Sequence, residues 1–424
     1  MKTCFLYKIS LLCILYASHI DAQDEWTSMG PGNIPFYTFG IDGSYLYAGG
    51  LGSHGGIFRT TDYGENWTQV NTGLPTDAST LISIAVTDTS ILAAVPPRKI
   101  FVSKDSGDTW NPVIIQSSLI WINSIVVAND PWNAIIGGGI RFKGTSGAVI
   151  SSNGTDWVEV SDGLPLSGSI HSLIVRDSTI FSGTNSGVYK LEFNISSWEP
   201  SNLGMTNLPV YALGQDELYI YAGSERNGIF RSTDGENWSQ INNGLETENT
   251  IFKSFAFYSL NIFAASIGNH SGVFQSNDHG EHWSSFNEGL PLNADIHALA
   301  VHGPYLFAGT DNYGVYRRSI PGFTSTNDMV DAGFENNIQI YPNPGSGKFT
   351  FSLSPAKSST DEFNDIEIIC YSPLGQLLYR KGLMPVHGEI KTNLDFSNYP
   401  DGIYMLQIQN QNKSAFKKLI INKN

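Results

Sequence analysis

The chain has 424 residues, more than one hydrophobic core usually organises, so we expect one large domain and a smaller second one. Its 43 glycines, 12% aromatic residues and only 15% charged residues favour a β-rich protein with many turns over a helical or disordered one. The formal net charge of −15 argues against a nucleic-acid backbone or an anionic membrane surface as a partner.

The N-terminus has the pattern of a secretory signal peptide. Lys2 and Lys8 precede an apolar run over residues 9–17, and the small residue Ala22 stands just before an acidic stretch. We predict a signal peptide over residues 1–22 and no transmembrane segment after it. Two of the three cysteines lie in this segment, so Cys370 alone remains and the mature chain cannot form an internal disulfide.

A motif of the form S/T-x-D-x-G-x-x-W recurs along residues 23–320. It joins an apolar strand of period two to a tight polar turn that ends on a tryptophan. Full copies span residues 60–67, 103–110 and 276–283, and copies one residue shorter span 151–157 and 232–238. The residues to which we assign a structural role in these turns are Asp62, Gly64, Trp67, Asp105, Gly107, Trp110, Asp234, Gly235, Trp238, Asp278, Gly280 and Trp283.

The spacing of the tryptophans predicts a seven-bladed β-propeller. Seven of them, from Trp26 to Trp283, are separated by 41, 43, 47, 41, 40 and 45 residues, the length of a four-stranded blade. Trp26 has no motif before it, and the last strand of the array, near Tyr316, has no tryptophan after it. We therefore expect the strand starting at Trp26 to complete the last blade, which removes the exposed sheet edges.

The repeated turn resembles the Asp-box, or BNR, repeat of sialidase-like β-propellers. That resemblance implies turns on the outer rim, away from the axis of the propeller. It also implies that the aspartates stabilise the turn, although calcium binding or contacts at the rim stay open as alternatives.

After the array, residues 321–336 have no apolar period, and we expect a linker there. Residues 337–424 alternate short strands with turns, which predicts a small antiparallel β-sandwich. Its motifs are an opening Y-P-N-P, a P-L-G-Q turn, a D-G-I-Y strand and a basic end. The residues that carry them are Tyr341, Pro342, Asn343, Pro344, Gly347, Gly375, Gly402 and Tyr404.

This segment resembles the type A C-terminal sorting domain of the type IX secretion system. The resemblance implies export through the periplasm, followed by secretion or display at the outer-membrane surface. It also implies that the type IX secretion machinery is a partner of this protein. In that family the domain is typically cleaved and the cargo attached to surface lipopolysaccharide.

The sequence does not name a reaction. A sialidase needs three converging arginines and a tyrosine activated by a glutamate, and the Arg-Ile-Pro signature of that family is missing from the sequence. We expect Arg59 and Arg231 near the rim and Arg317 at the end of the last strand. The arginines expected after second strands, where a loop faces the pocket, are Arg98, Arg141, Arg176 and Arg226.

A second enzyme class is the xyloglucanase-like glycosidases, for which Asp130 and Asp311 are candidate carboxylates. No metal site is indicated, because the histidines are scattered, and no cofactor is expected. The aromatic residues Trp121, Trp132 and Tyr313, expected on loops, could stack on sugar rings. We therefore predict a non-enzymatic binding module for carbohydrate or protein, with a glycoside hydrolase as the competing prediction.

Overall fold

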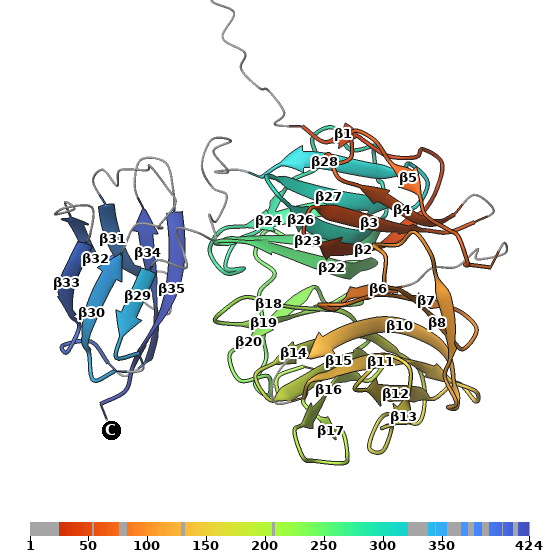
Figure 1. The fold of residues 1–424 in the computed structure, drawn as a ribbon, viewed down its shortest axis with the longest axis horizontal. Helices are drawn as coiled ribbons and strands as arrows, with labels where there is room; N and C mark the ends of the chain where they lie inside the picture. Colours follow the sequence, from red (N-terminus) through yellow and green to blue (C-terminus); the bar gives the residue numbers. More distant parts are fainter. Residues whose placement is uncertain are drawn as a thin grey trace, which may run out of the picture.

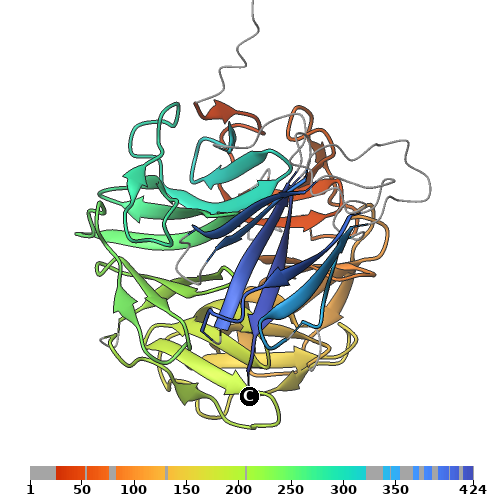
Figure 2. The ribbon, with the colours of Figure 1, turned by 90° about the vertical axis from the view of Figure 1, so that its left-hand side faces the viewer.

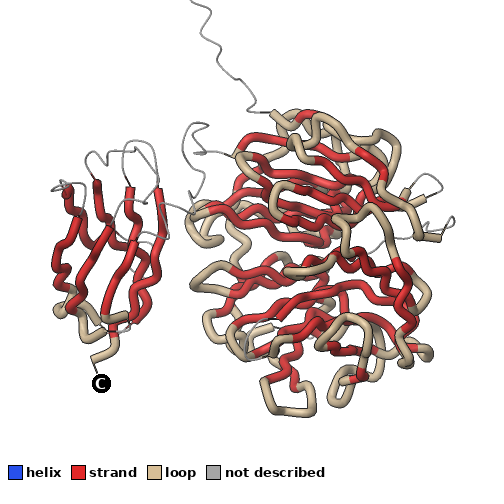
Figure 3. Tube along the Cα trace, in the orientation of Figure 1, coloured by secondary structure: helices blue, strands red, loops and turns tan. Residues whose placement is uncertain are grey.

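The structure is a computed structural model that describes residues 25–423, apart from 53–54, 76–82, 129–131, 206–207, 321–337, 344, 354–365, 372–376, 384–389, 401 and 410–413. The expected signal peptide and linker therefore lie outside the described residues. Strands and the loops that join them make up the described chain (Figure 3). Within it, no helix has the length and apolar character needed to cross a membrane.

Residues 27–319 form seven antiparallel four-stranded sheets, the blades of a propeller (Figure 1). The first three blades are β2 (Phe36–Asp42), β3 (Tyr45–Gly50), β4 (Gly56–Thr60) and β5 (Thr68–Gln69); β6 (Ser83–Val86), β7 (Ile91–Val95), β8 (Lys99–Ser103) and β9 (Asn111–Ile114); and β10 (Leu119–Ala128), β11 (Ala134–Arg141), β12 (Ser146–Ser151) and β13 (Val158–Glu159).

The next three blades follow the same order. They are β14 (Ile170–Arg176), β15 (Thr179–Thr184), β16 (Gly187–Glu192) and β17 (Glu199–Pro200); β18 (Val210–Gln215), β19 (Ile220–Ser224), β20 (Ile229–Ser232) and β21 (Ser239–Gln240); and β22 (Thr250–Tyr258), β23 (Asn261–Gly268), β24 (Gly272–Ser276) and β25 (Ser284–Ser285). The seventh combines both ends of the array: β26 (Ile296–His302), β27 (Tyr305–Thr310), β28 (Val315–Ser319) and β1 (Thr27–Ser28).

The ring closes as the sequence predicts. The first strand of each blade contacts the first strand of the next, and β26 contacts β2. Figure 2 shows the blades following one another around the ring in chain order. The outer strand β1 pairs with β28, with Thr27 opposite Arg317 and Ser28 opposite Tyr316. The last blade therefore has no unpaired third strand.

The repeated tryptophans connect neighbouring blades. Six indole N–H groups donate to a backbone carbonyl of the preceding blade at 2.6 to 2.9 Å: Trp26 to Phe286, Trp67 to Met29, Trp110 to Val70, Trp198 to Val160, Trp238 to Ser201 and Trp283 to Ile241. The exception is Trp157, which donates to Gly154 of its own turn at 3.1 Å. The tryptophan period thus marks the contacts between blades as well as the blades themselves.

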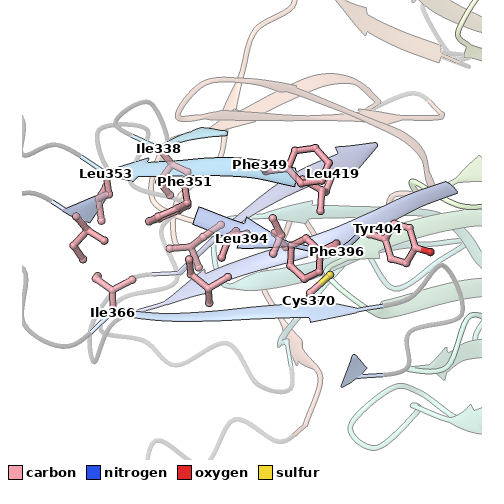
Figure 4. Packing of buried hydrophobic residues seen from close by; sticks show 14 of the residues in the cluster. Ile338, Phe349, Phe351, Leu353, Ile366, Cys370, Leu394, Phe396, Tyr404 and Leu419 are labelled. Carbon is pink, nitrogen blue, oxygen red and sulfur yellow. The ribbon is translucent and has the colours of Figure 1, made fainter. Parts of the chain in front are cut away.

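The C-terminal domain is a β-sandwich of two sheets. One contains β29 (Ile338–Tyr341), β30 (Lys348–Leu353) and β33 (Ile390–Asp395), and the other contains β32 (Leu377–Leu383), β31 (Ile366–Tyr371), β34 (Gly402–Gln409) and β35 (Ser414–Ile421). Alternate residues of these strands form a separate apolar core (Figure 4). The thiol of Cys370 is buried in it.

Candidate functional site

A β-bulge recurs near the start of the first strand in six blades. Each bulge places one residue between two register-paired neighbours, as between Phe36 and Thr38 in β2. A bulge re-aims the side chain that it carries, and bulges are frequent at functional sites. We call these residues the axial ring: Tyr37, Asn123, His171, Tyr211, Lys253 and His297. The equivalent position of the second blade, residue 82, lies outside the described residues.

Ring residues of adjacent blades contact one another. The rings of His171 and Tyr211 lie 4.3 Å apart, and Nζ of Lys253 lies 4.5 Å from the centre of the Tyr211 ring. On the far side of Lys253, His297 stacks on Tyr37 at 4.0 Å. Together with Asn123, whose amide donates to the carbonyl of Ile170 at 2.8 Å, these contacts form an arc of polar side chains over the inner strands.

In most blades the residue after the bulge bonds to the next blade and so holds the axial-ring side chains in position. In five first strands it is Ser or Thr, and its hydroxyl oxygen accepts an N–H from the first strand of the next blade at 3.0 to 3.2 Å. These bonds join Thr38 to Ile84, Ser83 to Ile125, Ser124 to Leu173, Ser172 to Leu213 and Ser254 to Leu299. Alanine stands at this position in β18 and β26. The hydroxyls therefore hold neighbouring first strands in register beside the ring.

A second tier of polar groups comes from the turns between second and third strands. The Tyr37 hydroxyl donates to Oδ1 of Asp311 at 2.7 Å, and Nε2 of His297 lies 3.6 Å from the same oxygen. In the fourth blade, Nε2 of His171 lies 3.1 Å from Oδ1 of Asn185. The backbone N–H of Ser169 also donates to this amide oxygen, so the ring nitrogen of His171 is the donor.

Burial sets the charge of the ring. It lowers the pKa of His171 and of His297 to about 4, and the nearby ammonium of Lys253 adds to the shift. Burial also lowers the pKa of Lys253. The pKa values of the tyrosines are shifted upward instead. Burial and the carboxylate of Asp311 raise the pKa of Tyr37, and burial and the carboxylate of Glu225 raise the pKa of Tyr211. At neutral pH the ring thus offers neutral imidazoles and protonated phenols.

The axial ring and the repeated turns lie at opposite ends of the blades. In an antiparallel blade, the start of the first strand shares an end with the turn between the second and third strands, and the loop after the third strand lies at the other end. In each turn the aspartate bonds within the turn itself. Oδ1 of Asp62, for example, accepts from the Thr60 hydroxyl at 2.8 Å and from the N–H of Asn66 at 2.9 Å.

The same pattern holds in the other turns. Asp105, Asp234 and Asp278 each accept from the Ser two positions before and from a backbone N–H further along the turn. These bonds to the charged form lower the pKa of Asp105 to about 2. The glycines Gly64, Gly107, Gly235 and Gly280 have φ between 74° and 89°.

Three of these turns are each joined to the blade before them by one arginine. Arg59, Arg231 and Arg317 each lie over a tyrosine ring at 4.2 to 5.1 Å and donate both to a carbonyl and to a carboxylate of the next turn. The carboxylates are Asp108, Glu281 and Glu65. These arginines hold blades together and are not directed to the axial ring.

The other arginines do not converge either. Arg176 ends the first strand β14 and donates to the carbonyls of Asp216 and Glu217, so its expected place after a second strand is wrong; the chain turns back directly at residues 177–178. Arg141 pairs with Glu159, and Arg226 is 67% exposed beside Glu225. Arg98 is an exposed residue of the turn before β8. No arginine occupies any of the six described ring positions.

The predicted aromatic and acidic candidates are divided between the two ends. Asp311 belongs to the ring site, whereas Asp130 lies outside the described residues. Tyr313, 47% exposed, lies in the turn that also carries Asp311. Trp121, 43% exposed, belongs to strand β10 and not to a loop, because the strand begins at Leu119. Trp132 lies at the other end of its blade, where it donates to the carbonyl of Ser178 and packs on Phe193.

The described residues contain no group of three His, Cys, Asp or Glu side chains that could hold a metal ion. His279 and His282 contact different carboxylates. Nδ1 of His279 lies 3.1 Å from Oδ2 of Asp216 in the preceding blade, and Nδ1 of His282 lies 2.8 Å from Oδ2 of Asp278 in its own turn.

The sorting motif ties the start of the sandwich to its last strand. Oδ1 of Asn343 accepts the N–H of Ile420 at 2.8 Å, and the hydroxyl of the buried Tyr404 donates to Pro400 at 2.8 Å. Gly347 has a φ of 97°, and a Cβ on it would come within 2.7 Å of the Ser397 backbone. Gly402 begins β34, while Tyr341 precedes Pro342 through a cis peptide bond. Pro344 and Gly375 lie outside the described residues.

Comparison with known proteins assigns the second domain. Residues 339–422 match the family described as "Secretion system C-terminal sorting domain". No curated protein matches the chain in sequence.

Similar solved structures agree with the fold of the first domain. The extracellular domain of the putative one-component system BT4673 from B. thetaiotaomicron has a TM-score of 0.59 at 16% identity, and the match covers 91% of this chain and 51% of that one. The chain thus spans about half the length of that structure. YCF48 from Cyanidioschyzon merolae has a TM-score of 0.54 at 15% identity, covering 71% of this chain and 100% of that one.

A structure of YCF48 bound to D1 peptide has a TM-score of 0.55 at 15% identity, covering 70% of this chain and 97% of that one. At such identities these likenesses show the fold alone. The class of the protein is therefore an all-β, seven-bladed propeller followed by a secretion-system sorting domain. The sorting domain directs the chain through type IX secretion, by way of the periplasm, to the cell surface or the medium.

Proposed function

We propose that the protein is an exported binding module and that its axial ring binds a carbohydrate. The carrying observation is the arc of polar side chains on six consecutive bulges of the first strands. Binding sites are typically built from a few precisely placed polar groups on a rigid scaffold. The bonds between first strands supply that rigidity, so little conformational entropy is lost when a ligand binds.

The chemistry of the ring suits a ligand rich in hydroxyl groups. A hydroxyl both donates and accepts hydrogen bonds, so its partners must offer both. Tyr37 and Tyr211 offer protonated phenols, Asn123 an amide, and His171 and His297 neutral imidazoles, with Asp311 as an acceptor beside them. The exposed ring of Tyr313, in the same turn as Asp311, adds a surface on which a sugar can stack.

A glycoside hydrolase is the competing prediction, and the ring gives it less support. A tyrosine nucleophile needs activation, which corresponds to a lowered pKa. Burial and carboxylate neighbours raise the pKa of both ring tyrosines. A sialidase would in addition need converging arginines, whereas Arg98 is an exposed turn residue and the other arginines described above bond to other blades, to the outer strand of their own blade or to neighbouring loop residues.

We propose a structural role for the repeated turns, which we interpret as Asp-boxes. Each aspartate is held inside its own turn, and three of the turns also accept a bond from an arginine of the preceding blade.

We also propose the boundaries given above: a signal peptide over 1–22, a propeller over 23–320, a linker over 321–336 and the sorting domain over 337–424. Removal of the sorting domain at the surface and attachment of the propeller to lipopolysaccharide belong to the same proposal.

The test is a glycan array with the full mature chain, run beside a hydrolysis screen on the same glycans. Tyr37→Phe removes one ring hydroxyl, and Tyr47→Phe is its matched control, since the Tyr47 hydroxyl donates to Ser106 of the next blade. We expect Tyr37→Phe to weaken glycan binding roughly tenfold, the value of one hydrogen bond, and Tyr47→Phe to leave it unchanged. Equal effects of the two substitutions, or binding of peptides alone, would contradict the proposal.

A further inference from the structure

Lys253 is the only cation among the six described residues of the axial ring. It occupies the bulge of β22, with Tyr211 of β18 on one side and His297 of β26 on the other. Its Nζ contacts the face of the Tyr211 ring. Among the residues that the structure describes, no carboxylate forms an ion pair with this ammonium.

The carboxylates of the neighbouring turns have other partners. Asp311 accepts from Tyr37, and Oδ1 of Asp295 accepts the N–H of Gly268 at 2.9 Å. Glu225 is near enough to Tyr211 to raise the pKa of its hydroxyl, and its Oε1 lies 3.5 Å from Nε of Arg226. The described side chains around Lys253 therefore supply no counter-ion for its charge.

Such an arrangement is unfavourable unless another group completes it. The Lys253 side chain is partly buried, and removing a charge from water is costly, so that charges in protein interiors are normally paired and hydrogen-bonded. Burial accordingly lowers the pKa of Lys253, and the two histidines near it are neutral at pH 7. A ligand anion would supply the missing charge, and an ammonium can donate up to three hydrogen bonds to it.

We infer that Lys253 binds a carboxylate of the ligand, so that the carbohydrate taken by the axial ring is an acidic one of the uronic-acid type. This inference rests on the proposed function, because the hydroxyl-binding groups on both sides of Lys253 are what favour a sugar over a peptide. The carboxylate lies against Lys253, while the phenol, amide and imidazole groups bind the hydroxyls of the same sugar.

The test uses the full mature chain and two matched probes: a uronic-acid oligosaccharide and the same oligosaccharide with its carboxylates methyl-esterified. Binding is measured by titration calorimetry for the wild type, Lys253→Met, Lys253→Arg and Lys190→Met. Lys190 is the control, since it loses the same charge at a site already paired with Glu192 and Glu236. The denaturation midpoint of each variant checks that it is folded.

We expect the wild type to bind the acid roughly ten- to a hundredfold more tightly than the ester, the range for a charge-assisted hydrogen bond. Lys253→Met should abolish this difference between acid and ester, whereas Lys253→Arg and Lys190→Met should retain the difference. Equal wild-type affinities for acid and ester would overturn the inference and leave carbohydrate binding intact. Binding of a carboxylate-bearing peptide without either sugar would overturn both proposals.

Discussion

Closure of the ring by Trp26 can be tested by substituting it with alanine. The Trp26 side chain is 3% exposed, its indole donates to Phe286 at 2.6 Å, and its ring meets that of Phe286 edge to face at 6.1 Å. Replacing a buried tryptophan with alanine typically costs about 3 to 5 kcal/mol. We expect that loss here, because the cavity would open between the sixth blade and the strand that completes the seventh.

The matched control is Trp157→Ala. This tryptophan is only partly buried and its indole bonds within its own turn, so we expect a cost of about 1 to 2 kcal/mol. The free energy of unfolding is measured for both variants by guanidinium denaturation, followed by circular dichroism because each variant loses a fluorophore. A loss for Trp26→Ala that does not exceed the loss for Trp157→Ala would refute the closure argument.

Three further predictions concern stability and export. Ser254→Ala removes the acceptor of the Leu299 N–H and should lower the free energy of unfolding by about 1 kcal/mol, against no measurable change for the exposed Ser285→Ala in the same denaturation assay. His297 faces Lys253, Asp295 and Asp311, and its pKa of about 4 lies below that of an unfolded histidine, so the unfolded chain binds protons first as the pH falls. The denaturation midpoint should therefore decrease as the pH is lowered from 6.5 to about 4, and His297→Gln should make this decrease smaller. A decrease of the same size in His297→Gln would contradict this assignment. Deleting residues 337–424 should leave the propeller in the periplasm, measured by cell fractionation, and surface display of the shortened chain would contradict the sorting role.

The blades could be predicted from the sequence because one physical contact recurs in each. A tryptophan bonds to the preceding blade at nearly every junction between blades. The turn of the preceding blade that lies against this tryptophan carries a glycine, because any side chain there would clash with the tryptophan backbone. A Cβ on Gly73, for example, would come within 2.1 Å of the carbonyl oxygen of Trp110. Such constraints repeat with the blade, so period and closure are visible without coordinates.

The axial ring could not be found in the same way, because its six described positions carry four different residue types. The bulge carries Tyr37, Asn123, His171, Tyr211, Lys253 or His297, and no residue type marks the position. A weaker signal was present: an apolar residue, then the variable one, then a small residue, as in Phe252-Lys253-Ser254. It becomes recognisable only when register pairing shows that each triplet is a bulge.

The arginines show why a search by residue type led elsewhere. A sialidase site requires arginines, yet Arg59, Arg231 and Arg317 share one structural task, which is to bind the turn of the next blade through a carbonyl and a carboxylate. The end of the propeller that carries the repeated turns is thus occupied by contacts that hold neighbouring blades together. The other end carries side chains that vary from blade to blade on a backbone that does not. A fixed frame with variable side chains suits a binding site, so under the proposed function substitutions at the bulges, and not at the repeated turns, should alter the specificity of this protein.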